Sequence, residues 1–297
     1  MPLSIGNAPC SWGVEFADDP RNPPWTKVLD DARAAGYRGI ELGPIGFMPE
    51  DPAVLGEALA ERGLTLVGGV VFRPFHDPAK WDEVEDASRR TCRALAAHGA
   101  TRLVLIDSIA PRRAPTAGRG DEAERLTGGD REAFLGRLRT VAEMGSDEFG
   151  LSVTMHAHAA GYVEFEDELE AVIAAIDPRL LGVCLDTGHS VYAGFDPVAF
   201  YRRHPDRISY LHFKDVDPEV RKRVIAGRIG FYDACAAGLF CNLGDGAVDF
   251  PAFAAALADN GYAGWATVEQ DCDPAGPTSP IEDARANLDY LKSVGLA

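Results

Sequence analysis

Histidines and carboxylates follow four short apolar runs of this sequence, and both residue types bind divalent metals and transfer protons. The run at 181–185 ends in Asp186, and the run at 208–211 ends in His212. Imidazole and carboxylate ligands together suit Mn²⁺, Co²⁺, Fe²⁺ or Zn²⁺, and carboxylates also suit Mg²⁺. We therefore expect a divalent metal site, and its candidate ligands are His156, Asp186, His212 and Glu269.

Each candidate ligand, taken alone, also has a purely structural explanation. An aspartate after a strand often caps the next helix, and Asp186 has that option because Thr187 and Gly188 begin a turn. A histidine at a strand end is commonly a hydrogen-bonded structural residue. Four strand ends that all carry such residues are much harder to obtain by chance, which favours the metal site.

A lysine two residues beyond His212 adds a possible proton donor to these ligands. On an extended strand, Lys214 and His212 face the same side. The ammonium group would polarise a carbonyl or a departing hydroxyl, or it would merely pair with Asp215. The expected catalytic residues are Glu269, His212 and Lys214.

Several neighbouring residues are candidates for contact with a substrate. His189 follows Asp186 by three positions and is expected to contact substrate or to orient a ligand. Glu164 binds substrate in one interpretation and starts the next helix with a favourable charge in the other. The candidate substrate-binding residues are Trp12, Glu41, His158, Glu164 and His189.

The arrangement of helices and strands that must position these residues alternates regularly. Short apolar runs alternate with helical segments in eight strand–helix units, without a change of composition or a linker between them. This order predicts one (β/α)₈ TIM barrel over 1–297, in which chemistry occurs at the carboxyl ends of the strands. A doubly wound open sheet is the alternative. If it bound a dinucleotide, it would need a glycine-rich phosphate turn after its first strand, and Gly6-Asn7-Ala8-Pro9 is not one.

Two segments lack the periodicity of the rest. The segment 108–129 is predicted to be a long loop after the fourth strand, and 226–247 an irregular insertion. Long loops in compact domains often cover a site. The arginines of the first segment suggest a mobile cover over an anionic or polyhydroxyl ligand, and the alternative is an ordinary surface loop. These arginines are Arg112, Arg113, Arg119 and Arg125.

Composition excludes several classes of partner. The net charge of −17, with 46 acidic and 29 basic residues, repels phosphate backbones and anionic membranes, so we expect no nucleic acid and no membrane partner. No apolar run approaches the roughly 20 residues of a membrane span. No secretory signal is visible, and the cysteines form no CxxC pair. These features predict a cytoplasmic protein.

Four motifs then permit a comparison with a known family. They are LDTGH at 185–189, HFKD at 212–215, GDG at 244–246 followed by Asp249-Phe250, and GWATVEQD at 264–271. Together they resemble the sugar isomerase/epimerase superfamily of xylose isomerase-like barrels. Within it, the chain is most similar to inosose (2-keto-myo-inositol) dehydratases, which share the HxH pattern of His156 and His158. The resemblance covers nearly the whole chain.

One departure from the superfamily concerns the fifth strand. In many members this strand supplies a glutamate to the metal, whereas the corresponding place here holds His156. The fifth-strand ligand is therefore His156, His158 or Glu164.

The resemblance implies a metal-dependent lyase that dehydrates a keto-cyclitol or a related keto-sugar, with a small polyhydroxyl compound as substrate and inositol catabolism as the context. The alternative is a metal-dependent isomerase or 3-epimerase, which shares the proton-abstraction step. A barrel without activity, used for binding or regulation, is the third possibility, and the intact Asp186, His212 and Glu269 argue against it. The resemblance also implies a dimer or tetramer.

Overall fold

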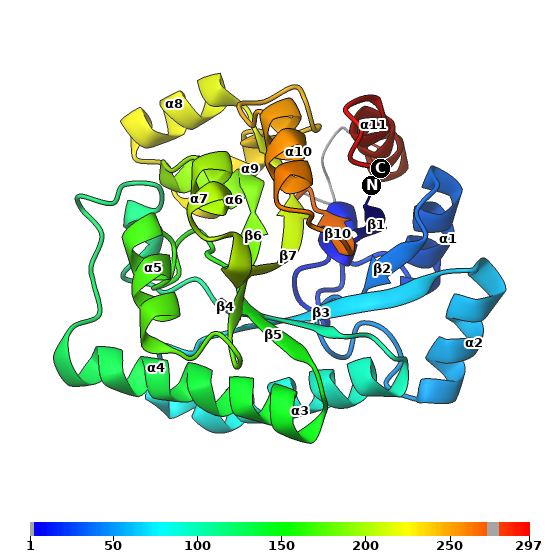
Figure 1. The fold of residues 1–297 in the computed structure, drawn as a ribbon, viewed down its shortest axis with the longest axis horizontal. Coiled ribbons are helices and arrows are strands. Elements are labelled where there is room, and N and C mark those ends of the chain that lie inside the picture. The colour runs from blue at the N-terminus through cyan, green and yellow to red at the C-terminus, as the bar shows by residue number, and fades with distance from the viewer. Residues whose placement is uncertain (1–2, 272–278) are drawn as a thin grey trace.

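Eight parallel strands close into a barrel in this computed structural model, which describes residues 3–271 and 279–297 (Figure 1). Their order around the barrel is β1-β10-β7-β6-β5-β4-β3-β2. The predicted (β/α)₈ barrel is confirmed, and the open sheet is excluded. The barrel strands are β1 (Ser4–Asn7), β2 (Gly39–Glu41), β3 (Thr65–Arg73), β4 (Arg102–Asp107), β5 (Ser152–Met155), β6 (Gly182–Asp186), β7 (Ile208–Phe213) and β10 (Trp265–Val268).

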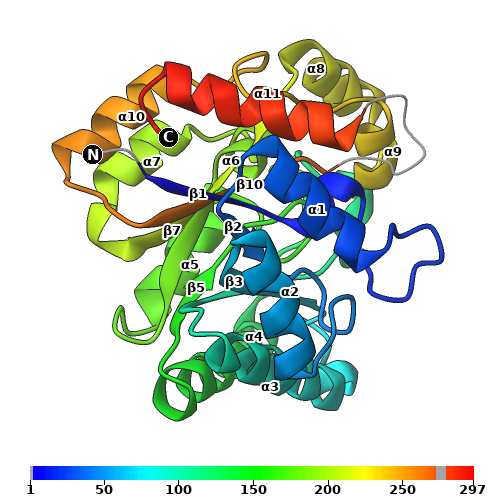
Figure 2. The ribbon, with the colours of Figure 1, turned by 90° about the vertical axis from the view of Figure 1, so that its right-hand side faces the viewer.

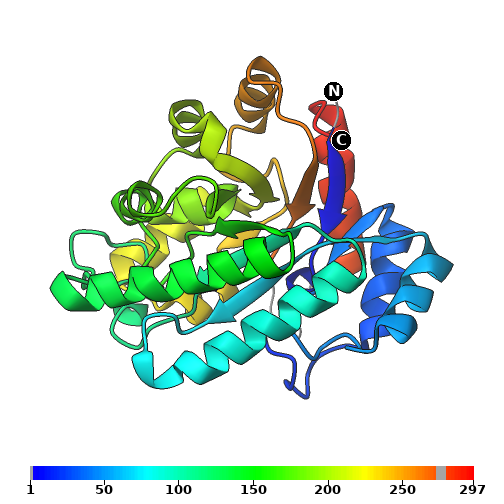
Figure 3. The same cartoon turned by 60° about the horizontal axis from the view of Figure 1, so that its bottom comes forward.

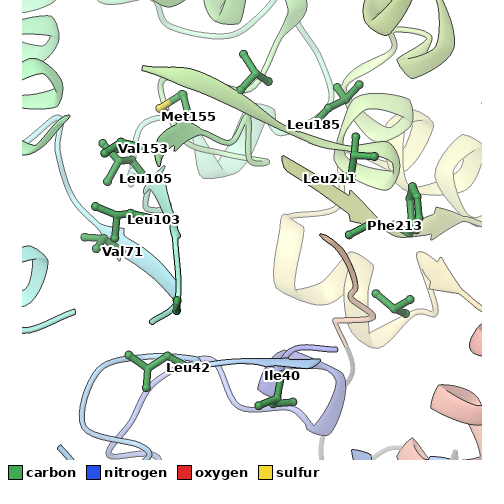
Figure 4. Packing of buried hydrophobic residues seen from close by; sticks show 14 of the residues in the cluster. Ile40, Leu42, Val71, Leu103, Leu105, Val153, Met155, Leu185, Leu211 and Phe213 are labelled. Atoms are coloured by element: carbon green, nitrogen blue, oxygen red, sulfur yellow. The ribbon is translucent and has the colours of Figure 1, made fainter. Parts of the chain in front are cut away.

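Helices surround the barrel and bury the outward side chains of its strands. Side chains alternate along a strand, so Leu103 and Leu105 of β4 pack toward the helices (Figure 4). Val104 and Ile106 of the same strand fill the barrel interior. The helices are α1 (Trp25–Ala35), α2 (Pro52–Arg62), α3 (Trp81–Ala97), α4 (Gly128–Glu143), α5 (Glu166–Ala175), α6 (Thr187–Ala193), α7 (Pro197–Arg203), α8 (Pro218–Gly227), α9 (Phe231–Ala236), α10 (Phe250–Asp259) and α11 (Pro280–Ser293).

The two ends of the chain meet and complete the barrel. The N–H of Leu3 donates to the carbonyl of Leu296 at 2.9 Å, and the first and last helices, α1 and α11, lie side by side (Figures 2 and 3). Strand β1 pairs with β10 in parallel, so Ser4 lies opposite Trp265. Among the described residues, no helix combines the length and the apolar character that crossing a membrane requires.

The segment 226–247 is more regular than the sequence indicated. It contains α9 and the short strand β9 (Phe240–Cys241), which pairs antiparallel with β8 (Asp215–Val216) directly after the seventh barrel strand. The sequence did not indicate these two short elements. A helix of six residues and a strand of two are too short to produce a hydrophobic periodicity in the sequence, so neither could be recognised there.

Candidate metal centre and active site

Four of the predicted residues converge at the carboxyl ends of β5, β6, β7 and β10. Their ligand atoms all lie within 4.8 Å of one another, and all four side chains are buried. Strand pairing explains the convergence, since Asp186 lies opposite His212 in the β6–β7 ladder and the other two residues follow β5 and β10 directly. We call these residues the metal cluster: His156, Asp186, His212 and Glu269.

Hydrogen bonding around His212 fits a bound cation. Its Nε2 lies 3.0 Å from Oε1 of Glu41, a carboxylate that also accepts a bond from the Tyr210 hydroxyl at 2.7 Å. With the ring hydrogen on Nε2, the lone pair of Nδ1 faces Oε2 of Glu269 at 3.2 Å, and this buried Nδ1 has no hydrogen-bond partner. Two facing lone pairs repel unless a cation or a proton lies beside them, so the donor set fits a divalent ion.

Asp186 has the structural role that the sequence also allowed. Its Oδ1 accepts a hydrogen bond from the N–H of His189 at 2.7 Å and so caps α6. Its Oδ2 remains available to the metal cluster, 3.3 Å from Nε2 of His156. One carboxylate therefore fixes the helix start and offers a metal ligand at the same time.

A second group of polar residues lies beside the metal cluster, a few positions further along the chain. Ligand atoms of His158, His189 and Asp271 also lie within 4.8 Å of one another, and we call these residues the second cluster. Asp271 was not among the site residues predicted from the sequence. It stands two residues beyond Glu269, as Lys214 does beyond His212, and this spacing was the available signal.

The backbone of Ala159 gives the two histidines of the second cluster opposite tautomers. Nδ1 of His158 lies 2.9 Å from the Ala159 carbonyl and must donate, which leaves a lone pair on its Nε2. The Ala159 N–H donates to Nδ1 of His189 at 3.2 Å, so the hydrogen of that ring is on Nε2, 3.6 Å from Oδ2 of Asp271. Burial lowers the pKa of both imidazoles, that of His158 well below 6.5, so both rings are neutral near pH 7.

Lys214 connects the two clusters. Its Nζ lies 2.8 Å from Asp271, 3.3 Å from Glu269 and 3.6 Å from Asp186. Burial alone would lower the pKa of this lysine, but the three carboxylates outweigh burial and raise it well above its ordinary value. The side chain is therefore an ammonium ion. Its contact with Asp271, together with the hydrogen on Nε2 of His189, makes the second cluster a poor site for a metal.

Both clusters open into one cavity of about 530 Å³, a volume typical of small-molecule sites. Residues of both clusters and Lys214 line it on the barrel side, and its walls include four aromatic side chains. Across the cavity, the hydroxyl of Tyr232 on α9 donates to Glu15 at 2.7 Å. The aromatic residues of the walls are Phe16, Phe72, Phe231 and Tyr232.

Two predicted substrate contacts lie elsewhere. The buried Trp12 is not among the residues that line the cavity, and its indole N–H donates to Asp31 on α1 at 3.0 Å. Glu164 accepts hydrogen bonds from the backbone N–H groups of Gly118 and Ala160 rather than facing the cavity. The structure thus gives both residues structural partners and leaves His156 as the fifth-strand member of the metal cluster.

The other predicted contacts lie at the site. Glu41 and His158 line the cavity, and His189 is buried next to Asp271.

The arginines of 108–129 face protein groups instead of the cavity. Arg113 is completely buried and pairs with Glu164 and Glu168. The other three interact with nearby acidic side chains, and Arg119 also donates to the carbonyl of Pro115. No described residue of this segment lines the cavity, so the structure does not support a cover that binds a ligand through these arginines.

Comparisons with known proteins show which family this chain belongs to. Residues 29–294 match the xylose isomerase-like TIM barrel family. The chain is 31% identical to an inosose dehydratase of Geobacillus kaustophilus, covering 98% of this chain and 94% of that protein. It is 33% identical to the rhizopine catabolism protein MocC of Rhizobium meliloti, covering 100% and 90%. Among solved structures, the IOLI protein with a bound zinc atom superposes with a TM-score of 0.73 at 15% identity, covering 98% of each chain.

The chain therefore belongs to the xylose isomerase-like TIM barrel family, as its motifs predicted, and it is an enzyme.

Proposed function

We propose that this enzyme is a divalent-metal-dependent dehydratase, a lyase acting on a keto-cyclitol such as 2-keto-myo-inositol. The name of the Geobacillus relative supports the substrate class. The observation that carries the proposal is the pairing of two clusters in one cavity. One cluster fits a cation, and the other holds a neutral base close to the ammonium group of Lys214, the proton donor. A cytoplasmic location and a dimer or tetramer are part of the same proposal.

The metal cluster would hold the ion through His156, Asp186, His212 and Glu269. Bound there, a divalent ion supplies Lewis acidity toward the carbonyl of the substrate. Glu41 accepts the Nε2 hydrogen of His212 and so would keep the lone pair of Nδ1 available to the ion.

The second cluster and Lys214 carry out the proton transfers. The Nε2 lone pair of His158 removes the proton from the carbon next to the carbonyl. The electron pair of that C–H bond forms a carbon–carbon double bond, and the bond to the hydroxyl on the next carbon breaks. The Lys214 ammonium gives this hydroxyl a proton, and it leaves as water. His158 then returns its proton to solvent, and Lys214 regains one.

Product analysis tests the proposal. Metal-loaded enzyme with 2-keto-myo-inositol should give a product lighter by one water that absorbs in the ultraviolet. Chelation should abolish this product, and added Mn²⁺ or Co²⁺ should restore it. A product that keeps the mass of the substrate, from this compound or from a ketohexose, would instead identify the isomerase or 3-epimerase.

A further inference from the structure

The turn that carries His158 has a strained conformation that its surroundings must maintain. Ala160 has φ of 62°, in the left-handed region that residues with a Cβ rarely adopt. A Cβ on the next residue, Gly161, would lie 2.4 Å from the carbonyl oxygen of Asp107, so only glycine fits there. Two backbone bonds close the turn, from His158 N–H to Val163 at 2.9 Å and from Gly161 N–H to His158 at 3.2 Å.

Glu164 holds this turn from the side away from the cavity. Its side chain is 1% exposed. Oε2 accepts the N–H of the strained Ala160 at 3.0 Å, and Oε1 accepts the N–H of Gly118 at 2.6 Å. One carboxylate therefore ties the turn to the 108–129 segment, whose contribution here is a backbone donor.

Arg113, from the same segment, completes the attachment. Its Nη2 lies 3.2 Å from Oε2 of Glu164, and its Nη1 lies 2.5 Å from Oε1 of Glu168. Glu168 also accepts the backbone N–H of Glu164 at 2.9 Å. The guanidinium lies over the rings of Tyr162 and Phe165, at 5.4 and 5.1 Å from their centroids. Arg113, which fixes the Glu164 carboxylate, is thus itself held by Glu168 and by two aromatic rings.

We propose that Glu164 and Arg113 are positioning residues, which hold the 158–161 turn so that Ala159 imposes opposite tautomers on His158 and His189. The segment 108–129 then stabilises the active site through Glu164, on the side of the turn away from the cavity. The catalytic consequence rests on the proposed dehydratase function, whereas the tautomers do not. If the turn relaxes, Nδ1 of His158 loses its acceptor. The hydrogen can then occupy Nε2, and no base faces the substrate.

Glu164→Gln tests this role with little change of shape. A glutamine amide must point its NH₂ at one of the donors that the carboxylate now accepts, so one contact becomes repulsive. We expect turnover to fall about 10–100-fold, with KM and metal content unchanged. Burial raises the pKa of Glu164 to about 7, so assays belong at pH of about 8, where the carboxylate is ionised.

The decisive readout is the ring-nitrogen NMR spectrum of the zinc-loaded enzyme without substrate, assigned through His158→Gln and His189→Gln. In the wild type, His158 should carry its hydrogen on Nδ1 and His189 on Nε2. In Glu164→Gln, both signals should move toward a tautomer mixture. Arg113→Lys keeps the charge but cannot reach both carboxylates, and it should shift the His158 signal in the same direction.

The matched control is Glu148→Gln, which removes an equal charge from an exposed pair with Arg89. It should leave turnover and both ring signals as in the wild type. Identical tautomers for the two wild-type histidines would overturn the proposal. So would unchanged tautomers in both Glu164→Gln and Arg113→Lys. The spectrum requires no turnover. It therefore tests the positioning role even if the dehydration assay shows that the proposed function is wrong.

Discussion

The metal cluster and the second cluster both contain histidines and carboxylates, and they lie beside each other at the carboxyl ends of the strands. Their histidines nevertheless have different neighbours. His156 and His158 follow the same strand, two positions apart. In the metal cluster, the ring of His212 lies between two carboxylates. In the second cluster, both rings are hydrogen-bonded to the backbone of one residue, Ala159.

This difference shows how neighbours decide the chemistry of an imidazole. Between carboxylates, a ring nitrogen without a hydrogen needs a cation or a proton nearby. Against a peptide group, which offers one donor and one acceptor, the ring is neutral and its tautomer is fixed. In the proposed function, one cluster binds the metal and the other transfers protons, and changing one cluster at a time tests this division.

The largest effect is expected from Asp186→Ala. The change removes a ligand oxygen and should abolish metal binding, which would lower turnover by at least about 10³-fold because a metal ion supplies several kcal/mol of stabilisation. Metal analysis of the purified protein checks this. Asp196→Ala is the matched control, because Asp196 caps α7 as Asp186 caps α6 but lies outside the cluster. The control should lose about 1 kcal/mol of stability and no metal. Unchanged metal content in Asp186→Ala would disprove the site.

His158→Gln should separate the clusters. The substitution removes the base but none of the metal cluster, so turnover should fall about 10²–10⁴-fold with metal content unchanged. Steady-state kinetics and metal analysis on the same preparation measure both quantities. Loss of the metal in this variant would show that the two clusters act as one metal site.

Lys214→Met should have a smaller effect, of about 10²-fold on turnover, with the metal in place. The variant removes the proton donor, while Nε2–H of His189 remains close to Asp271. The measurement is turnover of 2-keto-myo-inositol beside metal analysis. A variant as active as the wild type would remove Lys214 from the mechanism and leave His189 as the proton donor.

The sequence predicted the barrel and the metal cluster because both depend on local patterns. Strand–helix alternation identifies the barrel. Polar residues at the carboxyl ends of its strands then converge, because all these ends lie at one face of the barrel. The partners of Glu164 and Trp12 were not predictable in this way. Arg113 and Glu164 are far apart in the sequence, and their pairing depends on how two loops pack. Ala159 carries no sequence signal at all, since its peptide group rather than its side chain contacts the histidines.

The last prediction concerns stability instead of turnover, and it concerns Glu15, a carboxylate of the cavity wall that belongs to neither cluster. Burial raises its pKa to about 7 from 4.5, and the hydrogen bond from Tyr232 partly opposes this rise. Because the folded state then binds a proton more tightly than the unfolded state, the free energy of unfolding should fall as pH rises from about 4.5 to about 7. The fall is at most about 3.5 kcal/mol, since a pKa difference of one corresponds to about 1.4 kcal/mol.

Urea unfolding of wild type and Glu15→Gln across this pH range measures the contribution, which the variant should lack. Tyr232→Phe gives the opposite change. It removes the hydrogen bond that lowers the pKa of Glu15, so the loss of stability should extend to higher pH. An identical pH dependence in wild type and Glu15→Gln would mean that the carboxylate is already ionised and well solvated. The cavity wall would then be more polar than its aromatic lining indicates.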